Sequence, residues 1–119
     1  MSDFIEKRKF PRVEVSVPLR YKKLYGTTYL SSGTLTKNIS EGGIRFSTDK
    51  FISLACRLLL ELRLPSVPRS IKAISKVAWI KRLPSGNVYE VGNQFLAMTK
   101  EDDKIISDYL ENIANLAKA

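Results

Sequence analysis

The sequence predicts a mainly β protein, a six-stranded antiparallel β-barrel followed by one C-terminal α-helix. Three observations favour this fold class. Six short segments between residues 13 and 96 alternate apolar and polar side chains with a period of two. Glycines, prolines and small polar residues separate these segments. Beyond Met98 the apolar period changes to 3.6, which is typical of an amphipathic helix.

The length and charge of the chain limit its organisation and its partners. Its 119 residues have the size of one domain, so we expect a single core without a linker or repeat. We divide the chain into a flexible arm at residues 1–12, a barrel at 13–98 and a helix at 99–117. Twenty Lys and Arg against twelve Asp and Glu give a net charge of +8. This balance favours anionic partners, which include nucleic acid, nucleotides and acidic lipid.

The first three strands are expected at residues 13–21, 28–36 and 43–47. In the first of them valines, Leu19 and Tyr21 alternate with polar residues. Pro18 has no backbone N–H to donate, which indicates a sheet edge or a bulge at that point. The second strand is expected to be interrupted at residues 31–33 and to end where Asn38 opens a polar turn.

The last three strands are expected at residues 57–64, 71–80 and 88–96, after a connection over 48–55. Leu59 is the one apolar residue on the polar side of the first of these. Neither face of the next strand is cleanly polar, and the alternation places Trp79 on the same face as Val77. Gly92 inside the last strand indicates a bulge or a close contact.

Signals for the start and the buried face of a helix follow. Thr99 is a good N-cap and Asp102 stands three residues later, in the capping-box position. The first turn is acidic, which complements the helix dipole. The apolar stripe that we expect to face the barrel consists of Ile105, Ile106, Tyr109, Leu110, Ile113 and Leu116.

Several function classes are excluded or disfavoured by composition. The chain has no histidine and one cysteine, so it offers neither a Ser-His-Asp nor a Cys-His pair, and no zinc ligand set. We expect no catalysis, metal or cofactor, and we expect Cys56 to be a buried small hydrophobe. No apolar run reaches the length of a membrane span, and residues 1–10 are too polar for a signal peptide. A cytoplasmic protein without membrane insertion is therefore expected.

The arm carries four positive charges, at Lys7, Arg8, Lys9 and Arg12. Pro11 disfavours a helix here, so the run is expected to be extended. Four residues of extended chain separate Arg8 and Arg12 by at most roughly 14 Å. Arginine binds phosphate oxygens bidentately and also matches the O6 and N7 acceptors of guanine. The arm is thus a candidate anion or guanine site, although a solvated basic tail would have the same composition.

A second candidate segment begins at Asn38. The amide of Asn38 and the hydroxyl of Ser40 supply donors and acceptors for a purine edge or a phosphate. Gly42 and Gly43 leave room for a ligand to approach the backbone and permit positive φ. Taken alone, the segment is also explained as a simple turn. Trp79 leaves two alternatives open as well, packing in the core or a surface on which a base stacks.

Taken together, these segments resemble the PilZ domain family. Arg8-x-x-x-Arg12 followed by Asn38-x-Ser40-x-x-Gly43 is similar to the two-part RxxxR and [D/N]xSxxG signature of that family. The segments at residues 77–80 and 91–96, which lead into Thr99, are similar to its later strands and terminal helix. The resemblance covers about residues 6–110. It implies a β-barrel receptor for the second messenger cyclic di-GMP. We expect the ligand to switch the conformation of the protein by ordering the arm at residues 1–12 over the barrel, so that an effector protein reads the new surface.

The resemblance also implies site residues. Arg8 and Arg12 are expected to contact guanine and phosphate, with Lys7 and Lys9 beside them. Asn38 and Ser40 are expected to meet a guanine edge, while Gly42, Gly43 and Trp79 complete the site. Asn38 stands where many relatives have Asp, and Lys7 stands where many have Arg. Both differences lower the affinity that we expect for the ligand.

Two further functions stay open at this stage. A small basic β-barrel could bind single-stranded nucleic acid, which is disfavoured because most aromatic residues alternate toward the core. A PilZ-like adaptor could also act through protein contacts alone, without a ligand.

Overall fold

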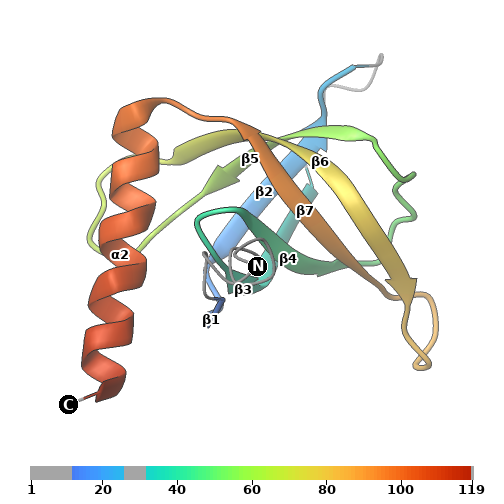
Figure 1. Cartoon of the computed structure of the whole chain (residues 1–119). Coiled ribbons are helices and arrows are strands. Elements are labelled where there is room, and N and C mark those ends of the chain that lie inside the picture. The colour runs from blue at the N-terminus through green and yellow to red at the C-terminus, as the bar shows by residue number, and fades with distance from the viewer. Residues whose placement is uncertain (1–11, 26–31, 119) are drawn as a thin grey trace, which may run out of the picture.

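The computed structural model describes residues 12–25 and 32–118 of the chain, with side chains to Leu116. These residues form a closed antiparallel β-barrel with one helix, α2 (Lys100–Lys118), standing beside it (Figure 1). The strands are β1 (Val13–Glu14), β2 (Pro18–Lys23), β3 (Ser32–Ile39), β4 (Gly43–Thr48), β5 (Arg57–Leu62), β6 (Ile71–Arg82) and β7 (Tyr89–Ala97). In the described part of the chain, no helix is long and apolar enough to cross a membrane.

The barrel has six strands once β1 and β2 are counted as one. The sheet order is β1-β3-β2-β5-β6-β7-β4, and the pairing of β3 with β4 closes it. β1 and β2 lie end to end along the same edge of β3, with Val13 opposite Ile39 and Pro18 opposite Leu35. The predicted six-stranded antiparallel barrel with a C-terminal helix is confirmed.

The first predicted strand is interrupted between β1 and β2, and Thr36 bridges the interruption. Its hydroxyl accepts from the amide of Val17 and donates to the carbonyl of Val15. The interruption comes directly before Pro18, the residue that indicated an irregularity. The alternative of a sheet edge at Pro18 is wrong, because β2 pairs with β3 on one side and β5 on the other.

Strand β3 departs from the sequence prediction at both ends. It is continuous through Ser32 and Gly33, where we expected an interruption, and it runs to Ile39. Asn38 therefore lies within the strand instead of opening the turn, and the polar turn is confined to residues 40–42. The expected positions at residues 26 to 31 lie outside the described residues.

The core fills the barrel with the inward-facing side chains of every long strand. Tyr21 packs against Phe46 with ring centroids 4.9 Å apart, and its hydroxyl forms a 2.5 Å hydrogen bond with Thr48 Oγ1. Cys56 is half-buried against this core, not fully buried as we expected. The side chains with at most 1 % exposure include Val17, Leu19, Ile39, Phe46, Leu58, Leu60, Leu62, Ile71, Val91 and Ile106.

Two register shifts between β6 and β7 decide which side chains face outward. Val77 lies opposite Asn93 but Trp79 lies opposite Gly92, so Ala78 is an extra residue on β6. Beyond this bulge the alternation reverses, and Ile80 instead of Trp79 faces the core with Val91. The prediction that Trp79 shares a face with Val77 is therefore wrong. An added residue in one strand shifts every later side chain to the other face.

The helix begins as predicted, but its first turn is attached differently. Thr99 Oγ1 accepts from the amide of Asp102, as expected of an N-cap. The Asp102 carboxylate does not complete a capping box. It accepts from the amide of Lys72 at 3.1 Å and forms an ion pair with Arg69, with 2.6 Å between Nη2 and Oδ1.

Asp102 is 4 % exposed, so its charge state depends on these partners. Burial acts to raise the pKa of Asp102, but the hydrogen bonds from Arg69 and Lys72, together with the Arg69 charge, hold this pKa below its ordinary value. The hydrogen bond and the charge of Asp102 in turn raise the pKa of Arg69. The start of α2 is thus fixed to the beginning of β6 by an ionised carboxylate.

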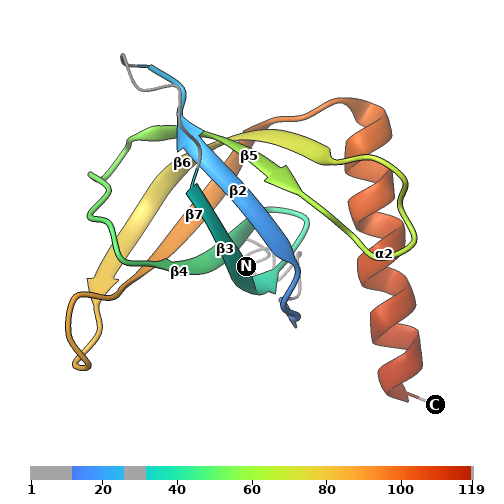
Figure 2. The ribbon, with the colours of Figure 1, turned by 180° about the vertical axis from the view of Figure 1, so that it is seen from behind.

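Only part of the predicted apolar stripe of α2 reaches the barrel. Ile106 and Leu110 are buried, while Ile105, Tyr109 and Ile113 are half-buried. Leu116 is 74 % exposed, because the last turns of the helix extend beyond the barrel (Figure 2). Burial raises the pKa of the Tyr109 phenol.

Candidate ligand-binding cleft

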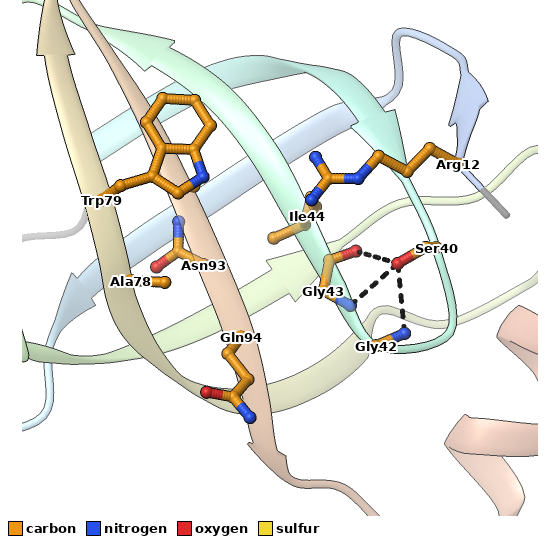
Figure 3. Close-up of a pocket in the computed structure, with 10 residues that line it drawn as sticks. Arg12, Ser40, Gly42, Gly43, Ile44, Ala78, Trp79, Asn93 and Gln94 are labelled. Atoms are coloured by element: carbon orange, nitrogen blue, oxygen red, sulfur yellow. Dashed lines mark hydrogen bonds between the residues drawn. The ribbon is translucent and has the colours of Figure 1, made fainter. Parts of the chain in front are cut away.

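A cleft of about 310 Å³ lies on the barrel beside the turn between β3 and β4. It collects residues from three separate parts of the sequence: the residue before β1, the 40–43 turn, and the paired strands β6 and β7. Figure 3 shows the Arg12 guanidinium pointing across the cleft toward the Trp79 indole. The lining residues are Arg12, Ser40, Gly42, Gly43, Ile44, Ala78, Trp79, Gly92, Asn93 and Gln94.

The 40–43 turn is held in shape by the hydroxyl of Ser40. Ser40 Oγ lies 3.2 Å from the amide of Gly42 and 3.1 Å from that of Gly43, and it accepts from both. The amide of Ser40 donates to the carbonyl of Gly43 at 2.9 Å, which closes the hairpin. Because a hydroxyl carries one donor besides its acceptor lone pairs, Ser40 keeps an O–H to offer to a ligand. Its distance of 3.4 Å from the Gly43 carbonyl leaves that donor weakly used.

Gly43 is required for a different reason from the one that we expected. In the described part of the chain, the glycine with positive φ is Gly86, so the 40–43 turn does not use the left-handed region. A Cβ on Gly43 would instead lie 2.1 Å from the backbone oxygen of Asn93. The glycine allows β4 to pair closely with β7, and this pairing forms the floor of the cleft.

Trp79 forms the opposite wall, outside the core. The bulge at Ala78 turns its indole outward over Gly92, where a Cβ would lie 2.2 Å from Nε1. The indole is half-buried and does not belong to the core cluster. The prediction of a close contact at Gly92 is confirmed. Of the two alternatives for Trp79, the core position is wrong.

Asn38 does not line the cleft. It lies on β3 with 5 % exposure, opposite Arg45 on β4. With its amide oriented to suit its neighbours, the Asn38 oxygen accepts from Arg45 Nη2 at 3.0 Å and from Nε at 3.1 Å. Arg45 Nη1 also lies 3.9 Å from Glu90 Oε1. The acceptor that a guanine edge would need is therefore occupied by a neighbouring arginine.

The structure thus brings together five of the nine residues that the sequence proposed as ligand-binding. Arg12, Ser40, Gly42, Gly43 and Trp79 share the cleft, and Asn38 lies apart from it. The remaining three, Lys7, Arg8 and Lys9, lie outside the described residues.

Asn93 and Gln94 of the cleft were not among the proposed site residues. Asn93 is 6 % exposed, and its Oδ1 accepts from the Ser75 hydroxyl at 3.1 Å. Its Nδ2 is buried without a partner among the described residues. The signal was present in the sequence, because Asn93 takes an inward position between Val91 and Phe95 in an otherwise apolar alternation. A buried polar side chain at such a position needs hydrogen-bond partners, which indicates a role besides core packing.

The turn that borders the cleft is also connected to the helix. The hydroxyl of Ser107 on α2 donates to Glu41 Oε2 at 3.1 Å. Glu41 lies within the 40–43 turn, between the residues that line the cleft. This side-chain hydrogen bond joins the turn to α2.

The PilZ domain family matches residues 6–112, which is most of the chain. This chain belongs to the PilZ domain family. PilZ domains are a family of cyclic di-GMP receptors and are usually non-catalytic. No curated protein sequence matches the chain.

Solved structures show the same fold at low sequence identity. The inhibitor of motility MotI/DgrA of Bacillus subtilis has 20% identity and a TM-score of 0.75, over 92% of this chain and 52% of that one. The PilZ domain of YcgR from Escherichia coli, solved with cyclic di-GMP, has 14% identity and a TM-score of 0.66, over 94% and 98%. The complex of K. pneumonia MrkH with cyclic di-GMP has 20% identity and a TM-score of 0.68, over 93% and 53%. The chain spans about half the length of the first and third of these proteins.

Proposed function

We propose that this PilZ domain binds cyclic di-GMP in the cleft between the 40–43 turn and Trp79, and that the bound form signals to a partner protein. One observation carries the proposal. The fold places a cation, a hydroxyl donor, a glycine-lined floor and an outward-facing, half-buried indole around one cleft, although the sequence keeps them far apart. Such a set suits a ligand with two guanines and two phosphodiesters. We place this function in the cytoplasm, as expected from the sequence.

The proposed roles follow from the chemistry of each side chain. Arg12 binds a phosphate or the O6 and N7 of guanine through its planar fork. Trp79 stacks on a guanine, which contributes about 1 to 3 kcal/mol by analogy with single-stranded nucleic-acid binding. Ser40 turns its weakly used O–H from the Gly43 carbonyl to a ligand acceptor, while Gly42 and Gly43 let the ligand approach the backbone.

The arm supplies the rest of the proposed site. Arg8 gives the second guanidinium, and Lys7 and Lys9 add charge that opposes the −2 of the ligand. Asn38 meets a guanine edge only if Arg45 releases its amide oxygen. We therefore expect Asn38 to contribute less to affinity than Arg12.

Isothermal titration calorimetry with cyclic di-GMP, GTP and a short single-stranded oligonucleotide tests the proposal. We expect the wild type to bind cyclic di-GMP in preference to the other two. Arg12→Ala should weaken binding at least tenfold, which corresponds to about 1.4 kcal/mol. Arg63→Ala, which removes an exposed arginine away from the cleft, should change affinity less than twofold.

The titration also separates the alternatives. Binding of the oligonucleotide alone would favour a nucleic-acid barrel, and no binding at all would favour the ligand-independent adaptor. Trp79 is the only tryptophan, so its fluorescence reports directly on the cleft. If calorimetry detects binding while the fluorescence stays constant, the stacking role is wrong.

The switch in this proposal acts through Glu41. A ligand seated against the 40–43 turn shifts Glu41, whose carboxylate accepts from Ser107 on α2. Hydrogen exchange in α2 should therefore change when cyclic di-GMP binds. Ser107→Ala should retain ligand binding and reduce this change, whereas Ser53→Ala, a matched hydroxyl deletion in an exposed loop, should not. An unchanged response in Ser107→Ala would reject this route.

A further inference from the structure

The outer surface of the barrel at β5 and β6 carries a regular pattern that the ligand cleft does not use. We name it the β5–β6 face and define it by Lys22, Arg57, Leu59, Ile74 and Lys76. Cross-strand pairing aligns these residues in two neighbouring rows. Lys22, Leu59 and Ile74 form one row, and Arg57 pairs with Lys76 in the next. Inward positions alternate with them and are buried.

The apolar row, formed by Leu59 and Ile74, does not contribute to the packing of the core. Leu59 and Ile74 are half-buried on the outside of the barrel. Neither belongs to the core cluster or to the apolar side chains packed against it. On β7, Ile74 lies opposite Ala97, and the neighbouring Leu96, which is the extra residue at the other register shift, is 40 % exposed. Leu59 is also the residue that breaks the polar side of its strand in the sequence.

The cationic row is not explained by sheet stability. Arg57 and Lys76 lie directly opposite each other, and like charges in that relation destabilise a sheet. Four residues along the same strands, beyond the pair of Leu59 and Ile74, Lys72 lies opposite Glu61, with 3.9 Å between Nζ and Oε2. The fold therefore pairs opposite charges on one side of the apolar row and like charges on the other. Lys22, Arg57 and Lys76 form no ion pair with a described residue.

We propose that the β5–β6 face docks a partner protein whose surface combines carboxylates with an aliphatic anchor. The carboxylates would neutralise Lys22, Arg57 and Lys76, and the anchor would cover Leu59 and Ile74. The aliphatic row selects protein over nucleic acid, because it offers no aromatic ring on which a base could stack. A central apolar contact with charges around it is the usual anatomy of a specific protein interface.

The face is continuous with the ligand cleft through one residue. Gln94 lines the cleft, and it pairs with Lys76 on one side and Gly43 on the other. A partner on this face would therefore border a ligand in the cleft. The docking proposal itself does not require cyclic di-GMP, and it can be tested without it.

The test selects peptides on the full chain from a library of random dodecapeptides, without cyclic di-GMP. Selected sequences should combine Asp or Glu with Leu, Ile, Val or Met. Fluorescence anisotropy then gives their affinity for each variant. Ile74→Asp and Lys76→Glu should weaken binding at least tenfold. The matched controls Leu35→Asp and Lys50→Glu, which change exposed residues elsewhere, should change it less than twofold.

Lys76→Glu keeps the test independent of folding defects. It replaces a like-charge pair with an opposite-charge pair, so we expect the melting temperature to rise slightly while peptide binding is lost. Selected peptides without acidic residues, no enrichment, or equal binding to Ile74→Asp and Lys76→Glu would overturn the proposal. An oligothymidylate that competes for the face, with the same dependence on Lys76, would identify it as a nucleic-acid surface instead.

Discussion

A polar side chain helps to hold both the 40–43 turn and the start of α2 in place, but the chemistry of the two joins differs. At the turn, the neutral hydroxyl of Ser40 accepts from two backbone amides. At the helix, the Asp102 carboxylate accepts from Lys72 and pairs with Arg69. The first join is insensitive to pH, whereas the second depends on a charge. A neutral hydroxyl thus holds the turn that borders the cleft, and an ionised carboxylate holds the start of α2.

The strongest way to break the turn is to add a side chain at Gly43. Gly43→Val places a Cβ against the Asn93 backbone oxygen, which cannot move without separating β4 from β7. We expect the free energy of unfolding to fall by about 3 kcal/mol, at the upper end for overpacking. Urea denaturation measures this free energy of unfolding. Gly33→Ala is the control, because a Cβ there meets nothing within 4 Å. Equal losses in the two variants would contradict the close approach.

The charged join is tested with Asp102→Asn. At pH 7 we expect the free energy of unfolding to fall by about 1 to 2 kcal/mol, because a charge-assisted hydrogen bond is lost. The folded pKa of Asp102 lies below the unfolded value of about 3.9, so its contribution is complete above that value. It is lost as the pH falls further through the folded pKa.

The difference between wild type and Asp102→Asn should therefore be constant from neutral pH down to about pH 5 and shrink below about pH 4. Thermal denaturation at a series of pH values measures this. Asp103→Asn, in the same helical turn but exposed, is the matched control and should have little effect at any pH. A difference that grows toward low pH would mean that Asp102 is not held ionised.

The smallest effect is expected at Ser40. Ser40→Ala leaves two turn amides without their acceptor, and we expect a loss of about 1 kcal/mol in the free energy of unfolding. Because no charge is involved, this loss should be the same at pH 7 and pH 4. Cyclic di-GMP affinity should fall as well, measured by calorimetry. Stability loss that varies with pH would remove the contrast between the two joins.

The strand and helix content was predictable because it depends on local periodicity. Leu58, Leu60 and Leu62 alternate in the sequence and are fully buried in the barrel. Thr99 was recognisable as an N-cap from its residue type and position alone. Such features depend on a few neighbouring residues, and so the sequence contains all the information they need.

The misplaced residues all depend on a partner strand. The outward position of Trp79 follows from the extra residue at Ala78, which appears only when β6 is aligned with β7. The occupied amide of Asn38 depends on Arg45, which β4 brings opposite. The role of Gly43 depends on the Asn93 carbonyl of β7. Tertiary pairing decided each of these, and alternation within one strand could not reveal it.

The bulge at Ala78 reverses the alternation of inward and outward side chains along β6, so the residues before and after it follow opposite patterns. Deletion of this single residue would place Trp79 directly after the inward-facing Val77, so regular alternation would keep the indole outward opposite Gly92 and Ile80 inward with Val91. A point substitution at Ala78 would preserve the number of residues and so the register of β6 with β7. The cleft should therefore tolerate both a change of residue type at Ala78 and the loss of this residue, and relatives that lack it can keep an outward side chain opposite Gly92 as the wall of the cleft.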